Sequence, residues 1–405
     1  MDSQPLANIK VLEISDSIAG AYCAKMLADL GAEVMKIEVP DIGDDSRHFG
    51  PFHHDVPDPE KSGLYLYLNA NKLGITLNLD SATGRNILKK LAGESDVIIE
   101  ETPPGFLEER GLDPGALRKL NRRLIPVSIS PFGRSGPYKD YVGYDLQMWH
   151  GSGIAHRFYG EPNREPLRGA WYMASHWAGI NAACAALLGL SGRDVLGQGQ
   201  SIDLSATESL ACLVTGMGYI SLYRERGDTF ARSGRVYDKG APSGMMKVRD
   251  GFVYITAVTA NQWEGLVQAM GAPEWAQAPI FKGHSYDRGP YAKEIYALME
   301  PWLSGHTMQE IFDACAKHGV PAAPVLSSGD LLASDHLQQR QFFLEYLHPH
   351  AGLLKVPGGV VRSTGASYPS PRPSPSLGQH NAEILSGRLG FSPAELRQLG
   401  NAAVI

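Results

Sequence analysis

Residues 10–38 read KVLEISDSIAGAYCAKMLADLGAEVMKIE, and two different periodicities alternate along them. The apolar residues of Ile9–Ile14 and Glu33–Glu38 predict two buried strands. Between them, Ala19–Leu30 begins with small residues and ends before Gly31, which predicts a helix closed by a glycine. A strand, a helix and a second strand in this order predict a parallel pair joined by a crossover helix.

The same unit recurs twice further along the chain. Ile75–Asp80 is followed by a helical pattern and then by the apolar run Asp96–Glu100. Asp113-Pro114 supplies the cap and the first residue of another helix, after which the chain returns as Leu124–Ser130. The repeated strand–helix–strand spacing predicts an α/β fold with a parallel sheet flanked by helices.

The pattern changes near Gly227, where we expect a smaller α+β domain. Asp250–Val258 predicts a strand, and Thr307 with Glu310 forms a capping box that opens a helix. The proline-rich stretch Tyr368–Gly378 predicts an extended strap that lies on another surface. The predicted boundaries are 1–226 for a large domain, 227–330 for a small domain and 331–405 for a C-terminal strap that returns to the large domain.

Composition argues against several classes of protein. The 405-residue chain is 43% hydrophobic and 20% charged, and its net charge of −6 offers no broad basic surface for nucleic acid. The sequence shows neither a secretory signal nor the run of roughly 18 apolar residues that a membrane helix needs. Four scattered cysteines without a CxxC pair are typical of reduced thiols in the cytoplasm, where we expect the protein.

The first strand–helix–strand unit has some features of a nucleotide site. A small-residue turn before a helix can bind phosphate, and Glu38 at the end of the second strand can bind a ribose. The GxGxxG motif is absent, so we favour close helix–sheet packing and disfavour an NAD-linked dehydrogenase. No metal site is predicted either, because neither His48–Asp55 nor the pair His348 and His350 is completed by a second cluster at ligand spacing.

The stretch GAWYMASHWAGINAACAALLGL, residues 169–190, has the composition of a site. Ser175 and His176 stand among aromatic residues before a small-residue helix. Adjacent residues on a helix point about 100° apart, so they rarely form a nucleophile–base pair. No GxSxG elbow surrounds Ser175. Taken alone, Ser175 is most simply interpreted as the N-cap of the helix that follows.

Seven stretches together resemble the family III CoA-transferases, a group that includes formyl-CoA and carnitine CoA-transferases and the α-methylacyl-CoA racemases. They are residues 10–38, 68–85, 95–113, 135–149, 197–210, 318–343 and 377–385. The resemblance implies a Rossmann-like large domain, a small α+β domain and a dimer of two chains threaded like linked rings. It implies coenzyme A or an acyl-CoA as substrate, and no metal. The CoA is expected near the first strand–helix turn, at Ser17, Ala19, Glu38, Lys72, Glu101 and Thr102.

The resemblance also implies a nucleophile that this chain lacks. Family members use an aspartate, four residues before the glycine that opens the small-residue helix, to form a mixed anhydride and then an aspartyl-CoA thioester. That glycine is Gly179 here, and Ser175 stands four residues before it. A serine would give an ordinary ester, which is far less activated than an anhydride. The racemase histidine is also missing, because Tyr144 precedes Asp145 in the GxD motif.

Two further departures favour a partner subunit. ETPPG at Glu101–Gly105 replaces an NFRPG-like stretch, and YDKGAPSGMM at Tyr237–Met246 replaces a glycine-rich loop. The chain resembles the aspartate-less partner in heteromeric members such as succinyl-CoA:benzylsuccinate CoA-transferase. We therefore expect a homologous subunit that carries the aspartate, with Tyr237–Met246 or its neighbours completing that subunit's site.

Two alternatives stay open. In the first alternative to the heteromer, the chain is a self-sufficient acyl-CoA enzyme that uses Ser175, His176 or Asp145. In the second, it is a non-enzymatic acyl-CoA-binding protein. The acid that receives CoA is also open. Several aromatic residues indicate an aromatic or bulky acyl group, or equally a core or an interface. These residues are Trp149, Trp171, Tyr172 and Trp177.

Overall fold

The computed structural model describes residues 4–215, 218–229, 232, 234, 239–359, 361 and 371–405. The chain forms two compact units, each assembled from separated segments. The large unit holds residues 1–154, 169–221 and 339–405, and the small unit holds 155–168 and 222–338. The boundaries expected at 226 and 330 stand against 221 and 338 here, and the excursion of 155–168 into the small unit was not expected.

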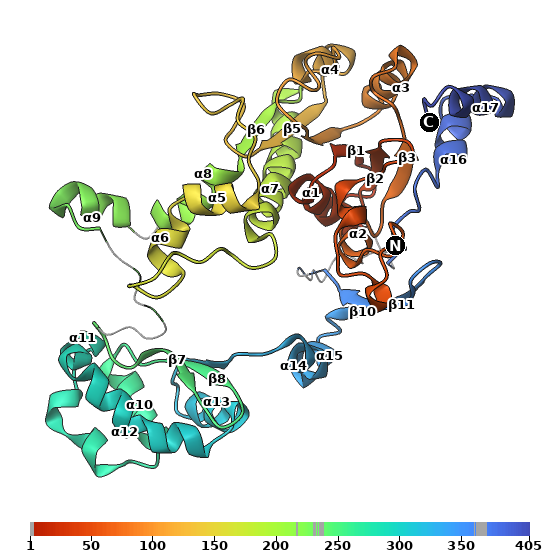
Figure 1. The fold of residues 1–405 in the computed structure, drawn as a ribbon. Coiled ribbons are helices and arrows are strands. Elements are labelled where there is room, and N and C mark those ends of the chain that lie inside the picture. Colours follow the sequence, from red (N-terminus) through yellow and green to blue (C-terminus); the bar gives the residue numbers. More distant parts are fainter. Residues whose placement is uncertain are drawn as a thin grey trace. The chain divides into compact units, whose positions relative to one another are not determined.

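The large unit is built on a six-stranded parallel sheet in the order β3-β2-β1-β4-β5-β6 (Figure 1). Its central strand pairs on both sides, with Val11 in register with Val34 of β2 and Val97 of β4. This arrangement confirms the predicted α/β fold with a parallel, Rossmann-like sheet. The strands are β1 Lys10–Ser15, β2 Glu33–Glu38, β3 Leu73–Thr76, β4 Val97–Glu101, β5 Ile125–Ser130 and β6 Ile202–Ser205.

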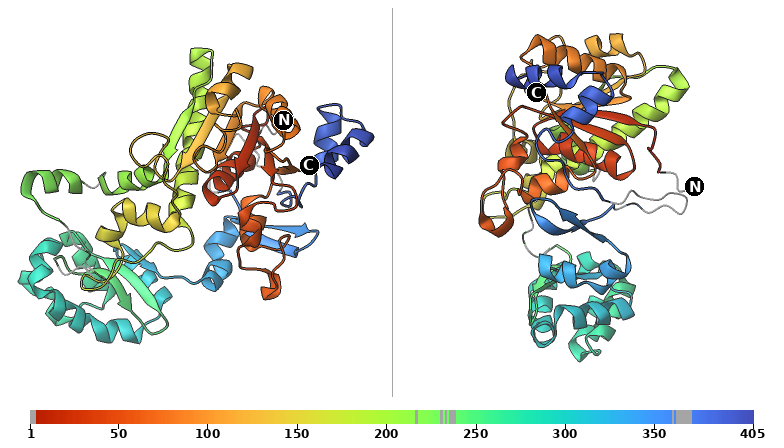
Figure 2. Two further views of the ribbon diagram at one scale, coloured as in Figure 1. Left: turned by 45° about the horizontal axis from the view of Figure 1, so that its top comes forward. Right: turned by 90° about the vertical axis from the view of Figure 1, so that its right-hand side faces the viewer.

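Helices cover both faces of this sheet, as the two views of Figure 2 show. Helices α1 and α7 pack against each other, with α1 on β1, β2 and β4 and α7 on β5 and β6. The helices that lie wholly in this unit are α1 Ile18–Asp29, α2 Gly63–Leu68, α3 Ala82–Gly93, α4 Pro114–Leu120, α5 Asp145–Gly151, α7 Met173–Leu196, α8 Ala206–Thr215, α16 Asn381–Gly387 and α17 Pro393–Asn401. Three more cross a unit boundary: α6 Ile154–Phe158, α9 Tyr219–Arg226 and α15 Asp335–Gln339.

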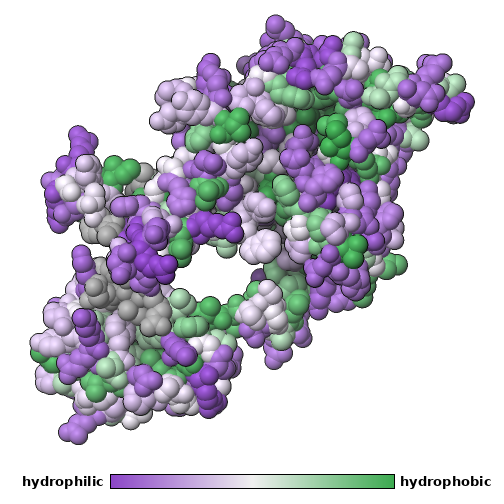
Figure 3. Space-filling model, in the orientation of Figure 1, coloured by the Kyte–Doolittle hydropathy of each residue, from purple (hydrophilic) through white to green (hydrophobic). Residues whose placement is uncertain are grey.

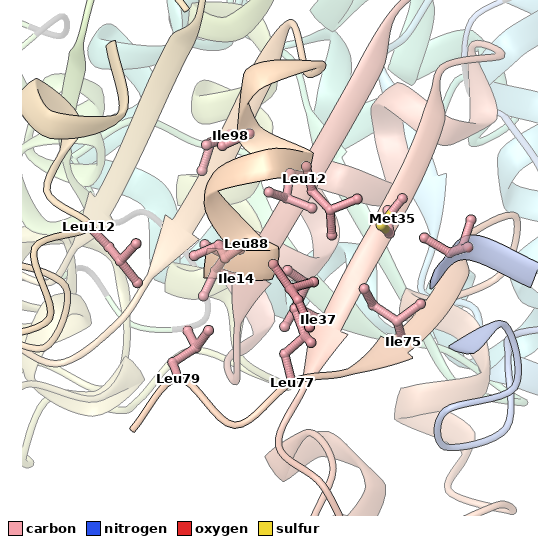
Figure 4. Packing of buried hydrophobic residues seen from close by; sticks show 14 of the residues in the cluster. Leu12, Ile14, Met35, Ile37, Ile75, Leu77, Leu79, Leu88, Ile98 and Leu112 are labelled. Atoms are coloured by element: carbon pink, nitrogen blue, oxygen red, sulfur yellow. The ribbon is translucent and has the colours of Figure 1, made fainter. Parts of the chain in front are cut away.

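The main core of the large unit lies between α3 and the strands β1, β2 and β3 (Figure 4). Leu12 and Ile14 of β1 point toward Leu88 of α3, because alternate residues of a strand face the same side of the sheet. Ile384 and Leu385 of α16 join this cluster, so the C-terminal segment contributes to the same core. Figure 3 shows hydrophilic side chains spread over the surface, with apolar ones in small groups.

Hydrogen bonds hold the C-terminal segment along β3, and their partners lie more than 300 residues apart in the sequence. The Arg372 backbone N–H donates to Asn71 Oδ1 at 2.7 Å, and the Gly74 N–H donates to His380 Nδ1 at 3.0 Å. The Thr76 N–H donates to Asn381 Oδ1 at 2.9 Å. Of the predicted strap Tyr368–Gly378, residues 368–370 lie outside the described residues.

Helix α7 is the one helix in the described ranges that is long and apolar enough to cross a membrane by length and composition. Half of its most apolar window is buried inside the protein, and the core helix of a globular protein passes the same test. Gly179 permits its close packing on α1, since a Cβ there would lie 2.8 Å from the Ala19 carbonyl oxygen. The packing therefore accounts for the apolar character of this helix without a membrane.

The small unit combines a three-stranded antiparallel sheet with helices, as expected for an α+β domain. Its strands are β7 Ser243–Lys247, β8 Phe252–Thr256 and β9 Ala322–Pro324. Its helices are α10 Ala260–Ala269, α11 Ser285–Arg288, α12 Ala292–Gly305, α13 Met308–Lys317 and α14 Ser328–Ala333. After α15 Asp335–Gln339, the chain re-enters the large unit as a hairpin of β10 Phe343–His348 and β11 Gly352–Pro357.

Candidate functional site

Ser175 lies in the first turn of α7, but it does not cap that helix. The helix begins at Met173 and its N-cap residue is Tyr172, so the interpretation of Ser175 as the N-cap is wrong. The chain enters α7 through a turn in which Trp171 and Tyr172 have φ values of 40° and 56°. Left-handed backbone at two successive aromatic residues is strained, and strain of this kind gathers at functional sites.

A carboxylate from another helix reaches the start of α7. Asp145, the first residue of α5, accepts hydrogen bonds at one oxygen, Oδ1, from both the Ser175 backbone N–H at 2.9 Å and the Ser175 hydroxyl at 3.0 Å. The N–H groups of a first helical turn have no partners within the helix, so an acceptor there stabilises it. The acceptor at this helix start is therefore the Asp145 carboxylate, and not the Ser175 side chain that the sequence predicted as the cap.

His176 is directed away from Ser175. Its Nδ1 lies 2.9 Å from the Tyr172 carbonyl oxygen, which identifies Nδ1 as the protonated nitrogen, and its ring packs edge-on against Tyr22 with centroids 4.8 Å apart. The Ser175 proton is directed at Asp145 instead. The geometry therefore gives no serine–histidine pair, in agreement with the 100° argument from the sequence.

The aromatic residues near Ser175 have different surroundings. Trp149 is buried in the core of the large unit, and the Trp177 indole N–H donates to the Ser209 carbonyl at 2.9 Å. Tyr172 stacks on Phe49 with centroids 6.3 Å apart. Trp171 is 73% exposed. Of the four, Trp171 is the one whose side chain is largely exposed, and it lies directly before α7.

Glu101 ends β4 and lies on the first turn of α1. Its Oε2 accepts from the Gly20 backbone N–H at 2.6 Å, and the Ser17 side chain also bonds to it. Burial raises the pKa of Glu101 to about 7, against the effect of these two hydrogen bonds. Neighbouring Thr102 is turned away, because its hydroxyl donates to Glu100 Oε2 at 2.9 Å. Ala19 is buried in the same turn of α1.

Lys72 lies in a buried ionic network beneath α1. Its ammonium contacts Glu13 Oε2 at 2.7 Å, the Ala21 carbonyl at 2.8 Å and Asn69 Oδ1 at 2.8 Å. These three acceptors match its three N–H donors. Burial lowers the pKa of Lys72 to about 8, although the charge of Glu13 opposes this shift.

Lys36 is the second cation of this network. It bridges Glu13 at 2.7 Å and Asp44 at 2.6 Å. Burial alone would favour neutral Lys36, but the two carboxylates hold its pKa above the usual value. The same pairing keeps the pKa of Glu13 and of Asp44 low despite their burial.

Glu38 is also bonded within the protein. Both of its oxygens accept from the Arg47 guanidinium, at 2.6 and 3.0 Å, and the Tyr65 hydroxyl donates to it at 3.1 Å. Arg47 comes from the short 3-10 segment Asp45–His48, where no periodicity in the sequence marked it. The side chains of Glu38 and Lys72 are therefore satisfied inside the protein, and their roles toward CoA stay predictions.

The remaining predicted segments lie elsewhere. Tyr237 and Asp238 are outside the described residues, while Ala241 is buried and Ser243–Lys247 forms β7 of the small unit. In the portions of the chain that the structure describes, no group of three or more His, Cys, Asp or Glu side chains could hold a metal ion.

Comparisons with known proteins agree over nearly the whole chain. The sequence model of CoA-transferase family III matches residues 6–381. A succinyl-CoA–D-citramalate CoA-transferase of Chloroflexus aurantiacus is 32% identical over 403 residues, covering 99% of this chain and 98% of the relative. The succinyl-CoA–L-malate CoA-transferase beta subunit of the same organism is 32% identical over 410 residues, with 99% and 98% covered.

Solved structures agree with the sequence relatives. The crystal structure of a CAIB/BAIF family protein from Brucella suis matches with a TM-score of 0.83 and 28% identity, covering 96% of this chain and 100% of that one. The two Chloroflexus relatives are named as CoA-transferases, and this chain belongs to CoA-transferase family III.

Proposed function

We propose that this chain is one subunit of a heteromeric CoA-transferase that moves CoA from succinyl-CoA to a carboxylic acid. Its partner is a homologous chain with an aspartate at the position of Ser175. The observation that carries this proposal is the hydroxyl at the start of α7, where Ser175 donates to Asp145 and offers no carboxylate of its own. By this proposal the chain alone is inactive and its own site is a pseudo-active site.

The names of two relatives support the donor and the subunit organisation. Both Chloroflexus relatives are named as succinyl-CoA-dependent CoA-transferases, and one of them is a beta subunit. For the acceptor we propose benzylsuccinate or another aromatic acid of anaerobic degradation, because Trp171 is exposed beside the strained turn that leads into α7. The two chains would pair as interlocked rings.

The proposed place for CoA on a chain of this family is the turn after β1. Ser17, Ala19 and Glu101 lie at that turn, whereas the Thr102 hydroxyl is turned toward Glu100, and Glu38 and Lys72 are bonded inside. The self-sufficient alternative requires an activated nucleophile at Ser175. It is disfavoured because His176 bonds to Tyr172, which leaves no histidine base on the serine hydroxyl.

Native mass spectrometry of the protein isolated from its source tests the heteromer. We expect a complex with a second chain of similar mass. Only the two chains together should transfer CoA from succinyl-CoA to an aromatic dicarboxylic acid, and neither chain should do so by itself. Ser175→Ala in this chain should leave that rate within about twofold, whereas alanine at the partner's aspartate should abolish it. A pure homodimer that is active and loses its rate on Ser175→Ala would overturn the proposal and favour the self-sufficient enzyme.

A further inference from the structure

The strand order places the topological switch point of the large unit between β1 and β4. Strands β2 and β3 lie on one side of this pair, and β5 and β6 lie on the other. In open parallel sheets, ligands bind in the crevice outside the carboxyl ends of the strands at such a point. The Ser17 side chain and the Gly20 backbone N–H lie there, and both bond to the Glu101 carboxylate. We call the Ser17 side chain and the Gly20 N–H the switch-point seat.

The seat is filled from within the chain. Glu101 Oε2 lies 2.6 Å from the Gly20 nitrogen, at the helix N-terminus where an anion would otherwise be attracted. A Cβ at Gly20 would lie 2.6 Å from Ser15 Cβ and 3.3 Å from Glu101 Cβ. The first turn of α1 is thus pressed against the ends of both strands, and the carboxylate occupies the place of a phosphate oxygen.

The charges around the seat also disfavour a phosphate. The nearby cations are already paired: Lys36 with Glu13 and Asp44, Lys72 with Glu13, Arg47 with Glu38 and Glu60, and Arg134 with Glu100. The charges of Asp44 and Glu100 add to the burial that raises the pKa of Glu101 to about 7. Burial likewise raises the pKa of the adjacent Asp16, to about 6. An incoming phosphate would meet carboxylates whose counter-ions are already engaged.

We propose that Glu101 is a specificity-determining residue that closes the switch-point seat of this chain to phosphate-bearing ligands. CoA in the heteromer is then bound by the partner's seat, and this chain has lost both the nucleophile and the ligand contact. The inference rests on the proposed function and deepens it, because it says which of the two chains binds CoA.

Calorimetric titration of CoA into the purified full-length chain tests the role of Glu101 directly. Glu101→Gln removes the charge and keeps the shape, while Glu101→Ala removes both. At pH ~8, where a carboxyl with a pKa of about 7 is ionised, we expect no saturable binding by the wild-type chain. Glu101→Ala should bind CoA saturably, at least ~10-fold more tightly than the weakest binding that the titration detects, with Glu101→Gln in between.

Glu108→Ala is the matched control, because Glu108 is exposed in the same segment after β4. It removes the same charge outside the seat and should leave CoA binding unchanged. Circular dichroism confirms folding, and Glu101→Gln serves as the folded variant should Glu101→Ala destabilise α1. Tight binding of one CoA per wild-type chain, or no gain in a folded Glu101→Gln chain, would overturn the inference.

The outcomes separate this inference from the proposed function. A chain that forms an active heteromer and yet binds CoA itself contradicts the inference only. A chain that has no partner, but gains CoA binding on Glu101→Ala, contradicts the heteromer only.

Discussion

At the scale of single residues, carboxylates accept backbone hydrogen bonds at the starts of two helices. Glu101 takes the N-terminus of α1, and Asp145 takes the N-terminus of α7. Each satisfies helix N–H groups that would otherwise bond to a substrate or to water. A helix start that is already paired within the chain offers fewer donors to a substrate than an open one.

Asp145→Ala should destabilise the large unit by about 1–2 kcal/mol, because it leaves the Ser175 N–H in the first turn of α7 without its acceptor. Ser175→Ala should cost less, since its backbone N–H keeps that bond. Urea unfolding of both variants and of the double variant measures the coupling between the two side chains. Asp140→Ala, in the exposed loop before α5, is the control. Equal losses of unfolding free energy for Asp140→Ala and Asp145→Ala would contradict the capping role of Asp145.

At the scale of elements, sequence periodicity predicted the first strand–helix–strand segment of the chain closely. The second strand was predicted at Glu33–Glu38, as observed, and the first helix at Ala19–Leu30 against an observed Ile18–Asp29. The start of α7 was missed because its acceptor comes from Asp145, 30 residues earlier in the chain. Periodicity reports which face of an element is buried, but it carries no information on partners from distant segments.

Arg288, at the end of α11, shows the same limit in the small unit. It is fully buried and donates to the carbonyl oxygens of Ala241 at 2.7 Å, Phe281 at 3.0 Å and Gly283 at 2.6 Å, as well as to that of Ala257. Burial lowers the pKa of Arg288 to about 10, so it stays charged at neutral pH. The cation thus joins segments that lie up to 47 residues apart.

Arg288→Met should therefore destabilise the small unit by roughly 3 kcal/mol, because the buried carbonyl groups lose their donor. Arg288→Lys should recover little of this loss, since an ammonium cannot reproduce the fork of the guanidinium. Thermal unfolding checks both variants against Arg249→Met, whose side chain is 53% exposed and pairs with Glu310. A Tm for Arg288→Met no lower than that of Arg249→Met would show that the carbonyl contacts contribute little.

At the scale of the whole molecule, the sequence predicted a small domain between an N-terminal part and a returning C-terminal part of the large domain. Residues 339–405 do belong to the large unit, and α16 packs its apolar side chains into the core between α3 and the sheet. The position of residues 155–168 in the small unit was not predicted. The ion pairs of Lys36 with Asp44 and of Glu38 with Arg47 were not predicted either, since Asp44 and Arg47 come from a segment without periodicity. Each of these features depends on which residues come into contact, and periodicity does not report that.

The raised pKa of one buried carboxyl group, Glu101, predicts how pH acts on the stability of the large unit. Glu101 belongs to the large unit, and its pKa is raised to about 7 from an ordinary value of 4.5. The folded state therefore binds this proton more tightly than the unfolded state does. The resulting stabilisation is complete below about pH 4.5 and is lost as the pH rises through about 7.

Glu101→Gln removes the titrating carboxyl and with it this pH dependence. The unfolding free energy of the wild type, relative to that of the variant, should therefore fall by up to about 3 kcal/mol between pH ~5 and ~8. The difference between the unfolding free energies of wild type and variant cancels the contributions of His348 and His380. Their pKa values are lowered, so they destabilise the folded chain at acid pH, in the opposite direction to Glu101. Scanning calorimetry across that range should confine the change to the transition of the large unit, while Glu108→Gln gives a flat difference. A difference that does not vary with pH would show that Glu101 is as well solvated in the folded chain as in the unfolded one, and the seat on α1 would then be open to water and to anions.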